Sequence, residues 1–204
     1  YAAYGTTDRK IKYNGLIEYS FNDKKEYRKE YPVNSIRLEY LYDINQLGQQ
    51  YMYTNKDNIF LAWKRQRDTR ATYLRNAELT YYREHYNGIA YGAVLRNKKE
   101  YSTDYAVFDR IEEDGRITPI KSYSMTELEF KFRYAPNEKF YQTRNYRYPI
   151  TFDAPVITLS HITARKGVLG ADYTYNRTDL GIQKRFWFSA FGYIDIIEVG
   201  GPSG

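Results

Sequence analysis

Residues 123–134 read Tyr-Ser-Met-Thr-Glu-Leu-Glu-Phe-Lys-Phe-Arg-Tyr, and this stretch decides the fold. From Glu127 to Tyr134, charged and apolar side chains alternate without exception. Successive side chains of a β-strand point to opposite faces, so a period of two predicts a strand with one charged and one apolar face. An α-helix would repeat its apolar positions every three or four residues instead.

The same alternation recurs along the chain. It is clear in 10–21, 35–44, 57–65 and 71–84, and weaker in 89–96, 153–162 and 171–177. One apolar phase continues from Ile182 to about residue 199 and predicts a single long last strand, while residues 1–5 form a stub. The fold class predicted is all-β: an antiparallel up-and-down meander of about nine or ten long strands.

The connections between these strands carry turn residues or charge. Asn87-Gly88 predicts a tight hairpin, and the charged stretch 97–122 reads as an exposed loop. We expect 86–88 on the short-turn, periplasmic side of a barrel. Consecutive strands of a meander run in opposite directions, so successive connections lie at alternate ends of the barrel. Counting from 86–88 places 22–34, 66–70, 97–122 and 163–170 on the opposite side, and 135–152 on the periplasmic side.

Composition excludes several classes of protein. The 204 residues contain no Cys, two His, 31 Lys and Arg, 25 Asp and Glu, and 25 Tyr. A disulfide scaffold and thiolate metal sites are excluded, and a His-rich metal site is not expected. No apolar run approaches the roughly 18 residues of a transmembrane helix, and the first residues lack a signal-peptide pattern. We therefore expect a mature form or an internal fragment.

Strand length and aromatic content favour a membrane β-barrel. A tilted membrane-spanning strand needs about 9–11 residues, and Tyr and Trp near strand ends are typical of the aromatic belts of such barrels. A soluble antiparallel sheet with one face on a core would show the same alternation. We predict one barrel region over 1–199 with open edges, followed by an irregular tail at 200–204.

The charged phase is predicted to face a lumen and the apolar phase to face lipid, because charge on the lipid face is costly. The lumen-facing polar residues expected are Arg37, Glu39, Glu127, Glu129, Lys131 and Arg133. The lipid-facing residues expected are Ile36, Leu38, Leu128, Phe130, Phe132, Phe186 and Phe188.

No motif predicts catalysis. Glu127 and Glu129 share a strand face, as a general acid–base pair could, but Lys131 and Arg133 on the same face favour a charged wall. Other candidates are Ca²⁺ binding by 112–114 with Asp109, and a triad drawn through His85 or His161 with Ser122 or Ser160. The positive charge is too dispersed for nucleic-acid binding, although basic loops could meet anionic lipid headgroups. We expect no enzyme activity, metal or cofactor.

Several longer stretches carry a family resemblance. They are 34–43, 57–65, 77–84, 133–143, 153–156, 166–170 and 183–187. Together they resemble a family of Bacteroidota outer-membrane proteins. Its members have an N-terminal carboxypeptidase-regulatory-like β-sandwich, followed by a surface-antigen-like barrel region of unknown function. The resemblance implies that this chain is an internal part of that barrel region, located in the bacterial outer membrane.

The function expected is a structural, transport or envelope-assembly role of an outer-membrane barrel. Its partners would be outer-membrane lipid and other envelope proteins, with no nucleic acid. Two alternatives stay open: an outer-membrane-embedded enzyme, and a soluble secreted Tyr-rich β-sheet that binds a ligand. An Arg-Gly-aromatic motif of insertase-type barrels is absent from the sequence.

Overall fold

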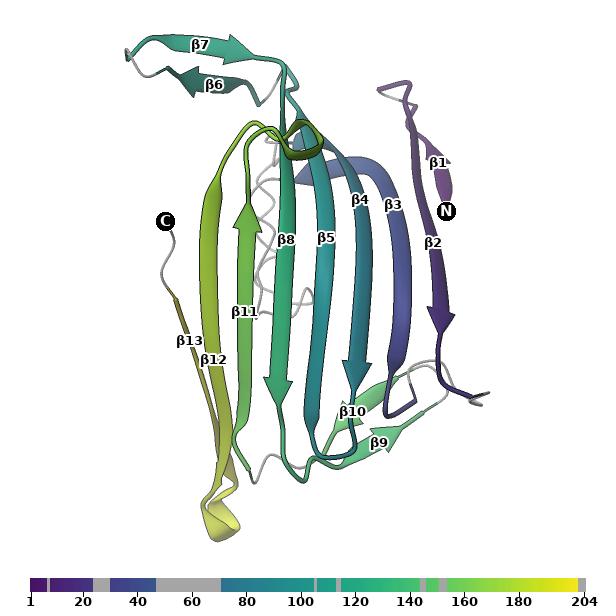
Figure 1. Cartoon of the computed structure of the whole chain (residues 1–204), viewed down its shortest axis with the longest axis vertical. Helices are drawn as coiled ribbons and strands as arrows, with labels where there is room; N and C mark the ends of the chain where they lie inside the picture. Colours follow the sequence, from purple (N-terminus) through teal and green to yellow (C-terminus); the bar gives the residue numbers. More distant parts are fainter. Residues whose placement is uncertain are drawn as a thin grey trace. The chain divides into compact units, whose positions relative to one another are not determined.

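Nine strands form one sheet in the computed structural model, which describes residues 1–6, 8–23, 30–46, 71–104, 106–112, 115–143, 146–150 and 154–201. In spatial order these strands are β1 (Ala2–Tyr4), β2 (Ile11–Ser20), β3 (Asn34–Gln46), β4 (Ala71–Glu84), β5 (Ile89–Tyr101), β8 (Ser122–Tyr134), β11 (Val156–Ala164), β12 (Tyr175–Trp187) and β13 (Tyr193–Gly200) (Figure 1). Each strand lies beside its predecessor in the chain, except that two small hairpins interrupt the series. The all-β antiparallel meander of about nine strands is therefore confirmed.

The two small hairpins form separate two-stranded sheets. One pairs β6 (Phe108–Ile111) with β7 (Ile117–Ile120), and the other pairs β9 (Phe140–Gln142) with β10 (Arg147–Pro149). Among the described residues, helix is limited to two 3-10 turns, η1 (Val168–Gly170) and η2 (Ser189–Phe191). The described part of the chain contains no long apolar helix of the kind that crosses a membrane.

The chain divides into two compact units, and five strands contribute residues to both. The first unit comprises Tyr1–Gly15, Tyr40–Asn76 and Lys98–Ser124, and the second comprises Leu16–Glu39, Ala77–Asn97 and Met125–Gly204. Aromatic rings hold the first unit together. Tyr13 stacks on Tyr40 with ring centres 5.8 Å apart, and Tyr42 stacks on Tyr73 at 6.1 Å. The Tyr73 hydroxyl donates to Asp8 at 2.6 Å, and this hydrogen bond, together with the ion pair from Lys12, lowers the pKa of Asp8 to about 2.

Strict alternation located most strands well, but two expectations about strand boundaries were wrong. The apolar phase from Ile182 to residue 199 is two antiparallel strands, β12 and β13, joined through η2 and Gly192, whose φ is 101°. The stretch 97–122 is not only loop, because β5 extends to Tyr101 and the β6–β7 hairpin lies within it. The strand expected at 57–65, with Trp63, lies outside the described residues.

The expectation that 22–34 lies at the end of the sheet opposite the hairpin at 86–88 was also wrong. The Glu84 amide donates to the Val33 carbonyl at 2.7 Å, and the Tyr31 hydroxyl donates to the His85 carbonyl. The connection before β3 therefore lies at the same end as the hairpin at 86–88, not at the opposite end. The error came from counting 57–65 as a spanning strand between β3 and β4, which are neighbours in the sheet. The connection 135–152 contains two short strands, β9 and β10, which have three residues each and pair with each other.

The ends of the sheet order, β1 and β13, are not paired with each other in the described residues, so the sheet is open. β13 ends at Gly200, one residue beyond the predicted barrel region.

The β4–β5 hairpin generates a test of the fold in the second unit. Gly88 has a φ of 83°, and a Cβ on it would lie 2.3 Å from the Ala135 carbonyl oxygen. Gly167 has a φ of 90° but open space around it. We expect Gly167→Ala to cost about 1–2 kcal/mol, the strain of left-handed backbone. Gly88→Ala should cost more because the clash adds to that strain. Denaturant unfolding of the two variants measures the difference, and equal costs would contradict the close approach.

Candidate functional site

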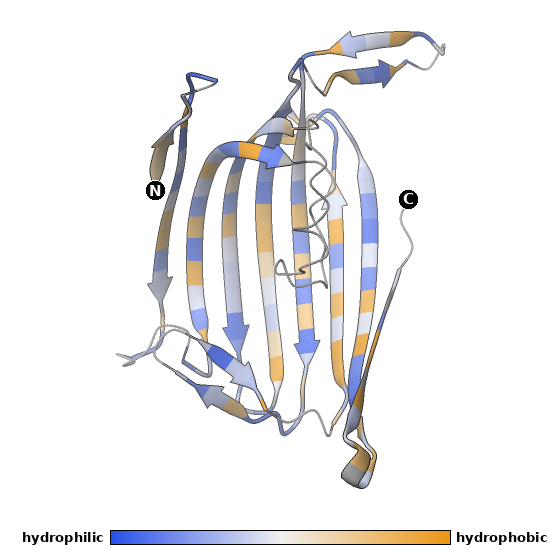
Figure 2. Cartoon of the chain, turned by 180° about the vertical axis from the view of Figure 1, so that it is seen from behind, coloured by the Kyte–Doolittle hydropathy of each residue, from blue (hydrophilic) through white to orange (hydrophobic). Residues whose placement is uncertain are grey.

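Register defines two faces of the second unit. Phe132, Leu159 and Leu180 lie opposite one another across β8, β11 and β12, as do Lys131, Ser160 and Asp179 one residue away. We call the face that carries Phe132, Leu159 and Leu180 the apolar face, and the one that carries Lys131, Ser160 and Asp179 the charged face. Figure 2 shows the corresponding alternation of hydrophobic and hydrophilic residues along the strands.

Burial on these faces is the reverse of that in a soluble sheet. Phe130 on the apolar face is 52% exposed, while Glu129 beside it on the charged face is 7% exposed. Among the described residues, the buried apolar side chains are Ala and Val alone, with no Leu, Ile, Phe, Met, Trp or Tyr. Soluble domains bury their large apolar residues and rarely bury acids. In the described part of the second unit, the charged face is thus less accessible to solvent than the apolar face.

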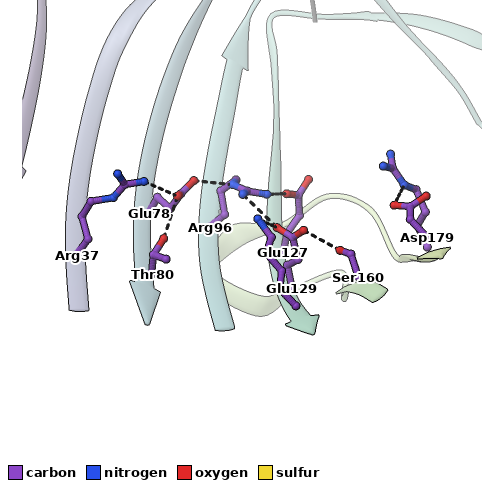
Figure 3. Close-up of polar contacts among 10 residues, drawn as sticks. Arg37, Glu78, Thr80, Arg96, Glu127, Glu129, Ser160 and Asp179 are labelled. Carbon is purple, nitrogen blue, oxygen red and sulfur yellow. Dashed lines mark hydrogen bonds and ion pairs between the residues drawn. The ribbon is translucent and has the colours of Figure 1, made fainter. Parts of the chain in front are cut away.

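One guanidinium organises the charged face. Arg96 on β5 donates from Nε to Glu78 on β4 at 2.8 Å, from Nη1 to Glu127 at 2.9 Å and from Nη2 to Glu129 at 3.3 Å (Figure 3). Arg37 on β3 lies 4.0 Å from the other oxygen of Glu78. Strand alternation sends each of these side chains to the same face, because Arg96 shares its phase with Ala90 and Val94. Small residues beside Arg96 leave room for the carboxylates of the neighbouring strands.

The remaining carboxylate oxygens of this cluster also accept hydrogen bonds. The Tyr175 hydroxyl donates to Glu127, and the Ser160 hydroxyl donates to Glu129 at 2.8 Å. Lys131 approaches Glu129 at 3.3 Å, and Thr80 donates to Glu78 at 3.0 Å. Every acid of this cluster is therefore held by both an ion pair and a hydroxyl donor. A general acid or base must reach a substrate, whereas the carboxylates of this cluster contact protein partners.

A second ionic cluster lies at the end of the second unit where β4 and β8 finish. Glu84 accepts two hydrogen bonds from Arg147 of the β9–β10 hairpin and a third from the Val33 amide at 2.8 Å. Arg133 pairs with Glu138 through both nitrogens, at 2.7 and 2.6 Å. Bidentate pairs of this kind fix geometry as well as supplying energy. They hold the small hairpin against the strand ends.

Aromatic rings complete that end cluster. Arg147 lies over the Phe140 ring at 4.5 Å, and the Tyr31 and Phe140 ring centres are 5.1 Å apart. Burial, followed by the charge of Glu84, raises the pKa of Tyr31 above its ordinary value. The hydroxyl therefore stays protonated and donates to the His85 carbonyl. Tyr31, Glu84, Arg133 and Phe140 line a shallow pocket there together with the hairpin at 86–88.

The residues predicted for the two faces fall as follows. Glu127, Glu129 and Lys131 belong to the Arg96 cluster, Arg37 lies beside Glu39 and Glu78 at its edge, and Arg133 belongs to the end cluster. Exposed members of the apolar set are Leu38, Phe130, Phe132 and Phe186, while Ile36 and Leu128 are half-buried. Phe188 follows the last residue of β12, so alternation assigns it to neither face. Whether the faces meet lumen and lipid stays a prediction.

Sequence reasoning missed Arg96 and Glu78, the centre of the charged cluster. A signal existed: Arg96 follows Ala90, Gly92 and Val94 in one strand phase, and a charge that adjoins such small residues on a buried face needs partners from neighbouring strands. Which strands supply them depends on the register, which alternation within one strand does not contain.

The other chemical candidates do not come together in the described residues. Ser160 and His161 are consecutive in β11 and lie on opposite faces, and the His161 ring bonds to Thr178 at 2.9 Å. His85 lies against the Tyr91 ring in the hairpin. Glu112 accepts from Thr118 at 3.2 Å, while 113 and 114 lie outside the described residues. No group of three or more metal-ligating side chains occurs in the part of the chain that the structure describes.

Arg96 provides the test of the charged face. Its side chain is 16% exposed, whereas that of Lys131 is 47% exposed. Arg96→Met leaves three carboxylates without their shared partner and should cost about 3–5 kcal/mol in unfolding free energy. Lys131→Met, the matched control, should cost about 0–1 kcal/mol. Adding Glu127→Gln and Glu129→Gln to Arg96→Met should recover part of the loss. Equal costs for the two single variants would contradict the central role of Arg96.

Comparison with known proteins identifies the family. No curated protein and no solved structure matches the chain. The model of the C-terminal domain of a family of unknown function, DUF5686, matches residues 1–201, nearly the whole chain. This chain therefore belongs to the DUF5686 C-terminal domain family.

Proposed function

We propose that this chain is part of a β-barrel of a bacterial outer membrane, with a structural, transport or envelope-assembly role and no catalytic site. The observation that carries the proposal is the exposure of the apolar face in the second unit together with the burial of the charged face. A membrane barrel has this arrangement because lipid covers its outside and its interior is polar.

The extent of the apolar face supports a bilayer rather than a small docking site. Exposed large apolar residues occur along this face on successive strands from β3 to β13, including Leu38, Leu79, Leu95, Phe130, Leu159, Leu180 and Ile196. Contiguous apolar patches of this kind on a protein surface mark membrane or partner contacts. The face becomes polar further along β11 and β12, where His161 lies opposite Thr178 and Thr163 opposite Asn176. An apolar band bounded by polar residues is the surface expected of a membrane-spanning sheet.

The charged face supports a wall and not an active site. Its acids are neutralised by Arg96, Lys131 and Arg37, and its hydroxyls donate to those acids. Such mutual pairing lowers the cost of burying charge. A role in catalysis would need a group left for a substrate, and no observation favours one here. We place the protein in the bacterial outer membrane in line with the family resemblance, with lipid and other envelope proteins as its partners.

Two substitutions on β12 test the proposal. Leu180 and Asn176 are exposed residues of the same face of the same strand, one inside the apolar band and one beyond it. Arg in a lipid-facing midplane position costs about 2–4 kcal/mol, and near the interface about 0–1 kcal/mol. Leu180→Arg should therefore impair membrane assembly of the full protein, while Asn176→Arg should assemble normally.

The measurement is the amount of folded protein in the membrane fraction, with the shift in gel migration between unboiled and boiled samples as the sign of a folded barrel. A soluble sheet whose apolar face packs on a core would show neither the membrane fraction nor the gel shift, although Leu180→Arg would destabilise it as well. Equal assembly of the two variants, or a full protein that stays in solution without detergent, would refute the membrane proposal and favour the soluble binding domain.

A further inference from the structure

The β12–β13 hairpin extends past its neighbouring strand. The last β11–β12 pair is Val156 opposite Gln183, whereas β12 and β13 stay paired to Trp187 and Tyr193. Residues 184–196, which we call the hairpin tip, thus include a two-stranded ribbon without a partner from β11. Figure 1 shows this hairpin reaching beyond the ends of β8 and β11 in the second unit.

The hairpin tip is apolar on both of its sides. Phe191 is 96% exposed at the turn, and Trp187, Phe188, Tyr193 and Ile194 are exposed as well. Trp187 lies opposite Tyr193 and Phe186 opposite Ile194, so the two faces of the ribbon each carry large apolar side chains. An isolated two-stranded hairpin is marginally stable in water at best. So much exposed ring surface indicates that something covers the tip.

Two basic side chains lie over these aromatic rings. The Arg185 guanidinium lies 3.8 Å from the centre of the Tyr193 ring and 5.6 Å from that of Trp187. The Lys184 ammonium lies 5.1 Å from the centre of the Phe186 ring. Aromatic rings mixed with basic residues are the composition of the membrane–water interface, where rings lie at headgroup depth and cations meet lipid phosphates. The hairpin tip holds these two cations and one acid, Asp195, so its net charge is positive and complements anionic phosphates.

The order of residues along β12 agrees with that depth. Leu180 and Ile182 belong to the apolar face, Lys184 follows in the same phase, and Phe186 lies further toward the turn. The aliphatic stretch thus ends where basic and aromatic residues begin, as at the boundary between acyl chains and headgroups. Charge complementarity therefore favours phospholipid as the occupant.

We propose that the hairpin tip is an interfacial anchor that inserts Trp187, Phe188 and Phe191 at the headgroup level of a phospholipid leaflet, with Lys184 and Arg185 against the phosphates. This inference rests on the proposed membrane location and adds the lipid class and the residues that bind it.

The test places a polarity-sensitive fluorophore at Ser189, an exposed residue in the tip, through Ser189→Cys; the chain has no cysteine of its own. A second labelled protein carries Leu180→Cys on the apolar face. Each full-length protein is reconstituted into vesicles of phosphatidylethanolamine and phosphatidylglycerol that contain lipid with a nitroxide either near the headgroup or at the end of the acyl chain. We expect position 180 to be quenched mainly by the deep nitroxide and position 189 mainly by the shallow one.

Further variants test the roles of the aromatic and the basic residues of the hairpin tip. Phe188→Ser with Phe191→Ser should reduce shallow quenching at position 189 several-fold. Lys184→Gln with Arg185→Gln should reduce it in vesicles that contain phosphatidylglycerol and have a smaller effect in vesicles of phosphatidylethanolamine and phosphatidylcholine. Quenching at 180 should be unchanged in both sets, which shows that the protein is still assembled.

The two proposals fail in different ways. Quenching at 180 without quenching at 189 would overturn the anchor and leave the membrane location standing. Absence of quenching at both positions would refute the membrane location and the anchor with it. Shallow quenching at 189 that survives the loss of both phenylalanines would overturn the role of the rings.

Discussion

A single guanidinium held between three carboxylates sets the conditions for the rest of the second unit. Arg96 meets Glu78 on one neighbouring strand and Glu127 and Glu129 on the other, so the charges are satisfied only if β4, β5 and β8 keep one register. A slip of one residue would turn every side chain of a strand to the opposite face. If β8 slipped, Arg96 would lose two of its three acids, and Glu127 and Glu129 would move to the apolar face. Electrostatic pairing here supplies the register specificity that large apolar side chains supply in most sheets.

The same pairing explains why the buried apolar residues are so small. Ala90 and Val94 precede Arg96 on its face, and the neighbouring strand bears acids, so the space between is filled by polar side chains and their hydrogen-bond partners. Little hydrophobic stabilisation comes from the interior of this unit, since the large rings and aliphatic chains lie on the other face. The environment of that face therefore decides how much of the unit's stability is realised.

Sequence alone located elements well where alternation is strict. Prediction and structure agree on 71–84 for β4 and differ by one residue at one end for β8. The division between β12 and β13 was missed for a geometric reason. Trp187 lies opposite Tyr193, so residues of equal parity share a face on both strands, and the apolar phase passes through the turn unbroken. The turn also lacks the Asn-Gly pair that marks the β4–β5 hairpin.

The charged cluster could be predicted only in part. Alternation brings Glu127, Glu129 and Lys131 to one side of β8, but the partner that unites them comes from β5, and the hydroxyls that complete it come from β11 and β12. Which residues face each other across strands depends on the connections between the strands. A period of two does not encode the lengths of the connections 102–121 and 135–155. The contacts between side chains of different strands are therefore the part of this site that sequence periodicity cannot predict.

The period of two also limits how this chain can change in length over evolution. An insertion of one residue within β8 would exchange the faces of the rest of that strand unless a β-bulge accommodated it, so single insertions within the strands are disfavoured. The β6–β7 and β9–β10 hairpins escape that limit because each forms its own two-stranded sheet outside the meander. Length variation among relatives should concentrate in these two connections, and new binding elements would arise there without disturbing the ion-paired wall.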